Sequence, residues 1–80
     1  MKVKVGDVLK VKRLLCYFKG QGAPSFHFSG EVSIAEIQHV SSDSFRFYWV
    51  KAYTDRVLTK KGWKSNVVEF SEKALTKALA

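Results

Sequence analysis

Hydrophobic and polar side chains alternate near the N-terminus, and this pattern predicts a β-strand. Leu9 and Val11 alternate with lysines, which is the period of a strand with one buried face. The alternation breaks at Arg13–Leu14, so we expect a bulge there, followed by an apolar run that ends at Phe18. The first strand is therefore predicted to be bent.

A loop and a second strand follow. Residues 19–25 contain two glycines and the only proline, as loops do. From Phe26 to Ile34, alternate positions are apolar apart from one glycine, which predicts a strand. Beyond that point the phase shifts, and residues 33–40 fit two structures. Residues 33–36 have the form of a helix capping box, whereas the β-branched side chains favour a long bulged strand, which we expect.

The third predicted strand is the most aromatic segment of the chain. Residues 45–53 contain no strand breaker, and the polar turn at 41–44 predicts a hairpin with residues 32–40. One face of this strand carries Arg46, Tyr48 and Val50. The other face, which we expect to be buried with Leu9 and Val11, carries Phe45, Phe47 and Trp49.

Two shorter strands are predicted after the third. The polar pair Thr54–Asp55 predicts a turn, after which residues 56–59 begin a fourth strand. Gly62 can take the positive φ of a tight turn, and residues 63–70 then return as a fifth strand.

A short helix is predicted at the C-terminus. Ser71 is a favourable N-cap for a helix over residues 72–79. Leu75 and Leu79 are four residues apart and share one helix face, so we expect both to close one end of the sheet.

These elements predict one mainly β domain over residues 1–80: an antiparallel, strongly bent five-stranded sheet or small barrel over about 6–70, and a helix over about 71–80. Residues 6–11, Gly-Asp-Val-Leu-Lys-Val, and residues 30–32, Gly-Glu-Val, resemble the opening of SH3-like barrels of the KOW and Tudor type. The basic barrel with a terminal helix is also similar to small chromatin proteins of archaea. The resemblance implies an SH3-like barrel and assigns no functional residue.

The charge of the chain is uneven as well as positive. The 80 residues include 14 basic and 7 acidic ones, for a net charge of +7. Residues 1–20 and 45–65 each hold six basic residues and one acidic one, whereas residues 21–44 hold three acidic residues and no basic one. A compact fold could merge the two basic segments into one face for nucleic acid or an acidic protein; the simpler alternative is a set of solvated strand faces.

Basic residues interleaved with aromatic ones indicate a nucleic-acid platform, because a ring can stack on a base while cations meet phosphates. We expect Tyr48 to lie outside, beside Arg46 and near Lys51, and expect the glycine turn to add lysines and an indole. Pairing of residues 56–68 with 8–13 would add two more lysines. The predicted nucleic-acid-binding residues are Lys10, Lys12, Arg46, Tyr48, Lys51, Lys60, Lys61, Trp63 and Lys64.

Other chemistry has little support in the sequence. The single cysteine, Cys16, allows no internal disulfide, and its apolar surroundings predict a buried side chain. With His27 and His39 it lacks the close ligand spacing of a zinc site, and no catalytic pair stands out. We expect no enzyme activity, metal or cofactor. The chain lacks the roughly 20 apolar residues of a membrane span, so we expect a soluble cytoplasmic protein, a monomer or weak homodimer.

Two functions fit these observations. The favoured one is a non-catalytic domain that binds DNA or RNA through a basic face with stacked aromatics. The alternative is a small accessory or inhibitory protein-interaction module, of the kind encoded by phages or mobile elements, which docks on a larger acidic host protein. The alternative is supported by large apolar residues in excess of what so short a chain is expected to bury.

Overall fold

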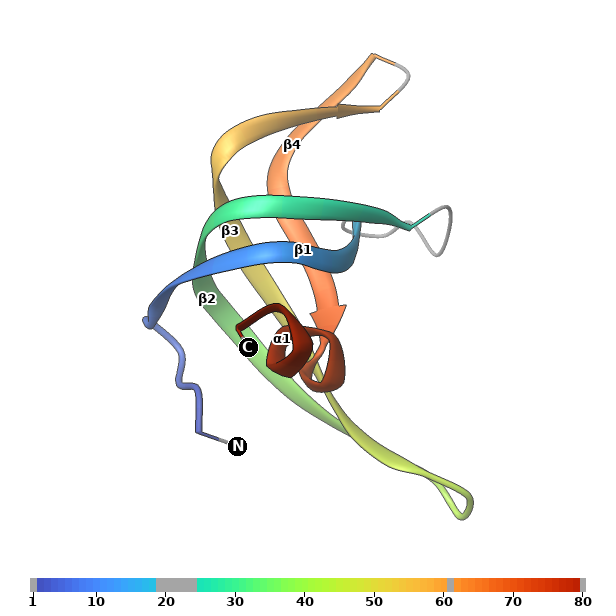
Figure 1. Cartoon of the computed structure of the whole chain (residues 1–80). Helices are drawn as coiled ribbons and strands as arrows, with labels where there is room; N and C mark the ends of the chain where they lie inside the picture. The colour runs from blue at the N-terminus through green and yellow to red at the C-terminus, as the bar shows by residue number, and fades with distance from the viewer. Residues whose placement is uncertain (1, 19–24, 61, 80) are drawn as a thin grey trace.

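Four antiparallel strands form one sheet that closes in a ring, and a short helix follows it (Figure 1). The computed structural model describes residues 2–18, 25–60 and 62–79, without the side chains of residues 60 and 63. The elements are β1 (Val8–Phe18), β2 (Phe26–Ser41), β3 (Arg46–Lys60), β4 (Trp63–Ser71) and α1 (Glu72–Leu79). Each strand pairs with the next, and β1 pairs with β4. The mainly β prediction is confirmed, and the predicted five strands are corrected to four.

The strand count differs because β3 continues through the predicted turn at Thr54–Asp55. Thr54 is buried, and its hydroxyl donates to the backbone carbonyl of Arg56 at 2.7 Å and lies 3.1 Å from that of Asn66. These contacts satisfy the polar side chain inside an extended strand. The pairing with β4 shifts register between Tyr53 and Leu58, so the local irregularity is a bulge.

The long second strand is confirmed, and the alternative of a helix over residues 33–40 is wrong. Ile34 shows why the chain stays extended. Its amide donates to the carbonyl of Asp7 at 2.9 Å, and its carbonyl accepts from the amide of Gly6 at 2.8 Å. On its other side β2 pairs with β3, with a register shift just after Ile34. The predicted bulge in β1 is also confirmed: the register shifts between Val11 and Leu14.

The ring encloses the core, and β3 turns the opposite face inward from the one predicted. Val50 and Ala52 are fully buried, whereas Phe45 is 52% exposed and Phe47 38% exposed. The ring interior is narrow, and Phe70 of β4, directly opposite Val50, already fills it. Small β3 side chains therefore face inward. The fully buried large side chains are Leu14, Cys16, Val32, Val50, Val68, Phe70 and Leu75.

Helix α1 packs mainly against β1. The predicted cap is confirmed, because the amide of Ala74 donates to the Ser71 hydroxyl oxygen at 3.2 Å. Leu75 is 1% exposed, as predicted. Leu79, expected to be its buried partner, is 44% exposed, because the helix turns Ala78 toward the core instead.

The β2–β3 hairpin extends beyond the ring and projects from it in Figure 1. Along β3, β4 ends opposite Trp49, and along β2, pairing with β1 ends at Ser33. The amide of Ser42 donates to the carbonyl of Phe45 at 2.8 Å and closes the predicted turn. We call residues 38–48, which include this turn, the arm.

Candidate functional site

Four aromatic side chains form a continuous row on the outer face of the sheet. Phe45 immediately precedes β3, Phe47 and Trp49 occupy the next alternate positions at the start of β3, and Tyr17 comes from β1. The ring centroids are 5.5 Å apart between Phe45 and Phe47 and 6.4 Å apart between Phe47 and Trp49. The Trp49 and Tyr17 centroids are 5.7 Å apart. We call these four residues the aromatic row.

The end of the aromatic row at the ring is fixed in place. The indole Nε1 of Trp49 donates to the carboxylate Oε1 of Glu69 at 2.6 Å. Glu69 lies on β4, in register with Tyr17 on one side and with Lys51 on the other. The row therefore runs from a half-buried, hydrogen-bonded indole at the ring to an exposed Phe45 on the arm.

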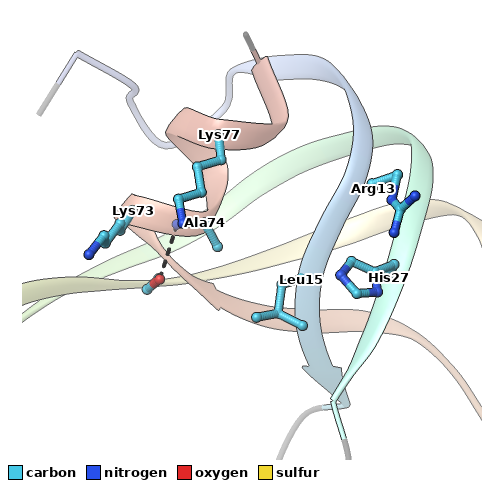
Figure 2. Close-up of a pocket in the computed structure, with 7 residues that line it drawn as sticks. Arg13, Leu15, His27, Lys73, Ala74 and Lys77 are labelled. Atoms are coloured by element: carbon cyan, nitrogen blue, oxygen red, sulfur yellow. Dashed lines mark hydrogen bonds between the residues drawn. The ribbon is translucent and has the colours of Figure 1, made fainter.

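A hollow of about 380 Å³ lies where α1 faces β1 and β2. Figure 2 shows Lys73 and Lys77 of α1 on one side of it, and Arg13 and His27 of the two strands on the other. Leu15 lies between the two sides. The hollow, which we call the basic pocket, is lined by Arg13, Leu15, His27, Ser71, Lys73, Ala74 and Lys77.

Positive charge dominates the basic pocket. Arg13, Lys73 and Lys77 are basic residues, and no acidic side chain is among the described residues that line the pocket. Within the described parts of the chain, no ion pair includes any of these three cations. Lys73 and Lys77 are one helical turn apart, so their charges repel each other. An anion in the pocket would offset this repulsion.

The bulge in β1 brings Arg13 to the basic pocket. Arg13 has a left-handed backbone with a φ of 56°, which is uncommon for a residue with a side chain. Its amide donates to the hydroxyl oxygen of Ser29 on β2 at 3.0 Å, and this bond holds the bulge in place. The unusual backbone at the bulge thus accompanies the placement of Arg13 in the lining of the basic pocket, across from α1 (Figure 2).

The aromatic row and the basic pocket form one continuous surface. Ser71 lines the pocket and is also the register partner of Trp49 in the row. Leu15 lines the pocket, and Tyr17 is two positions further along β1, on the same face. A ligand on the ring end of the row therefore reaches the pocket without crossing the sheet.

The predicted site on β3 needs correction. Arg46 and Tyr48 do share a face, as predicted, but that face continues inward at Val50. Tyr48 is half-buried, and its ring centroid lies 5.0 Å from that of His39. Lys51 lies on the opposite face, where its Nζ is 3.6 Å from Glu36 Oε1.

Within the described residues, strand pairing does not join the predicted lysines of β1 to Lys64 of β4. Lys10 and Lys12 are exposed on β1, and Lys64 is exposed on β4. The pairing of residues 56–68 with 8–13 that would add Lys10 and Lys12 does not occur among the described residues, because β1 meets β4 at Tyr17–Glu69 and Phe18–Val68. The predictions for Lys61 and for the side chains of Lys60 and Trp63 lie outside the described residues.

Sequence analysis misses the basic pocket because its residues come from three elements that only the fold brings together. One signal was available: Lys73 and Lys77 are four residues apart on the predicted helix, so they share a face. Nothing in the sequence places Arg13 or His27 beside that face. The aromatic row is missed because its β3 members fit the expected core equally well.

Cys16 is fully buried, as predicted, and burial raises the pKa of its thiol from 9.0 to about 12. Among the described residues, no three His, Cys, Asp or Glu side chains gather as a metal site would require. In the same residues, no helix has the length and apolar character of a membrane span.

Comparison with known proteins gives no relative: no family model, curated sequence or solved structure matches this chain.

Proposed function

We propose that the chain is a non-catalytic domain that binds single-stranded DNA or RNA, with bases against the aromatic row and phosphates in the basic pocket. The observation that carries the proposal is the continuity of these two surfaces at Ser71 and Trp49. Aromatic ring faces stack on any base, and basic side chains attract any phosphate, so such a surface binds strands with little sequence preference.

The spacing of the aromatic row favours a single strand over a duplex. Neighbouring ring centroids are 5.5 to 6.4 Å apart. Successive nucleotides of one strand in a duplex rise by only about 3.4 Å. This spacing does not match that of stacked bases in a duplex, whose base faces also lie inside. The Phe45 and Phe47 rings are stacked on each other and Phe47 meets Trp49 edge-on, so an extended single strand would place its bases on the exposed outer surfaces of these rings. We also propose that the ring with its terminal helix is a four-stranded variant of the SH3-like barrel.

The test is a salt titration of binding to thymidylate and uridylate oligomers and to a DNA duplex. We expect both single strands to bind more tightly than the duplex. If three cations contact phosphates, the log–log slope against salt should be about −2 for single strands. Absence of binding to every oligomer at 50 mM salt would refute the proposal.

Two variants separate stacking from charge. Phe47→Ala should weaken single-strand binding by roughly 1–3 kcal/mol without changing the salt slope, because stacking releases no counterions. Lys77→Gln should flatten the slope by about 0.7. Tyr53→Ala is the matched aromatic control, because Tyr53 is exposed on the same strand outside the row. Equal losses for Phe47→Ala and Tyr53→Ala would remove the row from the site.

The lysine turn predicted from the sequence is tested in the same assay. A Lys60→Gln/Lys61→Gln/Lys64→Gln variant should bind single strands nearly as well as the parent if the basic pocket holds the phosphates. A larger loss than that caused by Lys73→Gln/Lys77→Gln would move the phosphate site to the turn.

The protein-interaction module remains the second candidate, and one observation favours it. The outer face near Trp49 also carries two carboxylates. Glu69 accepts a hydrogen bond from the Trp49 indole, and Glu36 forms an ion pair with Lys51. These charges repel phosphate, whereas the exposed Phe45 and Phe47 suit an apolar protein surface. A folded chain that binds no oligomer would support this alternative.

A further inference from the structure

We infer that the basic pocket receives the terminal phosphate of a nucleic-acid strand, a phosphomonoester at the 5′ or 3′ end, in preference to an internal phosphodiester. This inference rests on the proposed binding of single strands. It adds a specificity that the aromatic row alone cannot supply, namely selection of strand ends.

The charge of the pocket exceeds what an internal phosphate needs. Arg13, Lys73 and Lys77 bring three full positive charges to one hollow, with His27 beside them and no carboxylate in the lining. An internal phosphodiester carries one negative charge, whereas a phosphomonoester carries about −1.5 to −2 at pH 7 and offers three strong acceptor oxygens. The terminal group therefore matches the pocket better.

The pocket also lies where the path of a bound strand ends. Ser71, the register partner of Trp49, is immediately followed by the first residue of α1. A strand that follows the aromatic row from the arm toward the ring therefore meets the helix at the pocket, where Lys73 and Lys77 lie on the α1 side and Arg13 and His27 on the opposite side (Figure 2). The Ser71 hydroxyl accepts a bond from the amide of Ala74, and its own hydrogen can still be donated to a phosphate oxygen.

The donor set fits a phosphate group. The guanidinium of Arg13 presents paired N–H donors that match two phosphate oxygens. Lys73 and Lys77 are point charges on α1, across the hollow from Arg13 and His27. The Lys73 ammonium is directed away from Arg13 in Figure 2, so Lys73 would have to change rotamer to contact an anion held between the helix and the strands. The unpaired state of all three cations among the described residues leaves each of them able to contribute.

The test compares one thymidylate octamer in three forms: with a 5′-phosphate, with a 3′-phosphate and with hydroxyls at both ends. Binding is measured by calorimetry at constant salt. We expect one phosphorylated form to bind about tenfold more tightly than the form without a terminal phosphate. Which end is preferred gives the direction of the strand along the row.

Two variants make the result specific to the pocket. Lys73→Gln/Lys77→Gln should abolish the preference for the phosphorylated form while retaining weaker binding of all three octamers. Lys2→Gln/Lys4→Gln is the charge-matched control: it also removes two positive charges and should leave the ratio between the forms unchanged, because neither lysine lines the pocket. Circular dichroism should show that both variants are folded, because the substituted lysines are exposed.

The outcomes distinguish this inference from the proposed function. Equal binding of all three octamers would overturn the inference and leave single-strand binding intact. Absence of binding to any octamer would overturn both. A preference that survives the Lys73→Gln/Lys77→Gln change would place the terminal phosphate elsewhere and overturn the inference.

Discussion

The ring and the arm share strands β2 and β3, but β3 buries different side chains in the two regions. In the ring, β3 turns Val50 and Ala52 inward against side chains of β4, and its outer face is left to larger residues. In the arm, no third strand from the described part of the chain lies beside Phe45 or Phe47, and these aromatic side chains are exposed. One β3 pattern therefore serves two environments.

This difference teaches that the size of the enclosed space, and not hydrophobicity alone, decides which face of a strand is buried. A four-stranded ring has little room inside, and Phe70 and Leu14 already fill it. The largest side chains of β3 are therefore placed outside, where they can contact a ligand. The following predictions test this contrast.

The strongest test is a pair of identical substitutions, one in each region. Phe70→Ala in the ring should lower the free energy of unfolding by about 3–5 kcal/mol, because Phe70 is fully buried. Phe47→Ala in the arm should cost about 1 kcal/mol or less, because its ring is partly solvated. Urea denaturation of both variants measures the difference. Similar losses would show that the arm packs as part of the core.

A second pair extends the contrast to the helix. Leu75→Ala should lower the free energy of unfolding by about 2–4 kcal/mol, because Leu75 is buried against the ring. Leu79→Ala should change it by less than about 0.5 kcal/mol, because that side chain is 44% exposed. Thermal melts of the two variants provide the comparison. The sequence-based expectation of two equal anchors predicts equal losses instead.

A third test addresses the crowded side of the ring at Gly30. A Cβ at this position would lie 2.9 Å from the guanidinium Nη2 of Arg56 and 2.9 Å from Phe28, and the φ is +152°. Gly30→Ala should cost about 2 kcal/mol. Gly62→Ala is the control, since its φ is +83° but no atom lies within 4 Å of the added Cβ. Equal destabilisation of the two variants would show that backbone conformation alone, without crowding, sets the cost.

The smallest effect concerns the thiol inside the ring. The pKa of Cys16 is about 12 when folded and near 9.0 when exposed, so unfolded chains release this proton first as the pH rises. The thiol contribution to stability is therefore complete below pH 9.0 and is lost between pH 9.0 and about 12. Between pH 8 and 10 we expect the parent to lose about 1 kcal/mol more than Cys16→Ala. Parallel pH profiles would mean that solvent reaches the thiol.

Local patterns in the sequence predict the strands and the helix well, but they predict poorly which face of a strand is buried. The bulge at Arg13, the long β2 and the cap at Ser71 follow from neighbouring residues, and the structure confirms them. The inward face of β3 does not, because both alternating sets are apolar: Phe45 and Phe47 on one side, Tyr48 and Val50 on the other. Only the closure of the ring decides between them.

The candidate site was harder to predict than the fold. The sequence predicts basic residues combined with aromatics, and the structure groups residues of these types at positions other than the predicted ones. Tyr48 turns toward His39, and Lys51 is paired with Glu36. The pocket forms because α1 packs beside β1, a strand far from the helix in sequence. No local sequence pattern predicts that these two elements lie side by side. The position of the pocket residues is set by long-range packing, which the periodicity of the sequence does not reveal.

The seam between β1 and β4 has a consequence for the order of folding. It joins Tyr17 to Glu69 and Phe18 to Val68, whereas the other pairings join strands adjacent along the chain. Contacts between distant segments lose more chain entropy on forming, so they form late. The chain should first assemble as an open four-stranded meander from β1 to β4, in which each strand pairs with the next, and pairing of β1 with β4 then closes the ring. Until that step, one edge of β4 can pair with another chain, so refolding yield should fall as protein concentration rises.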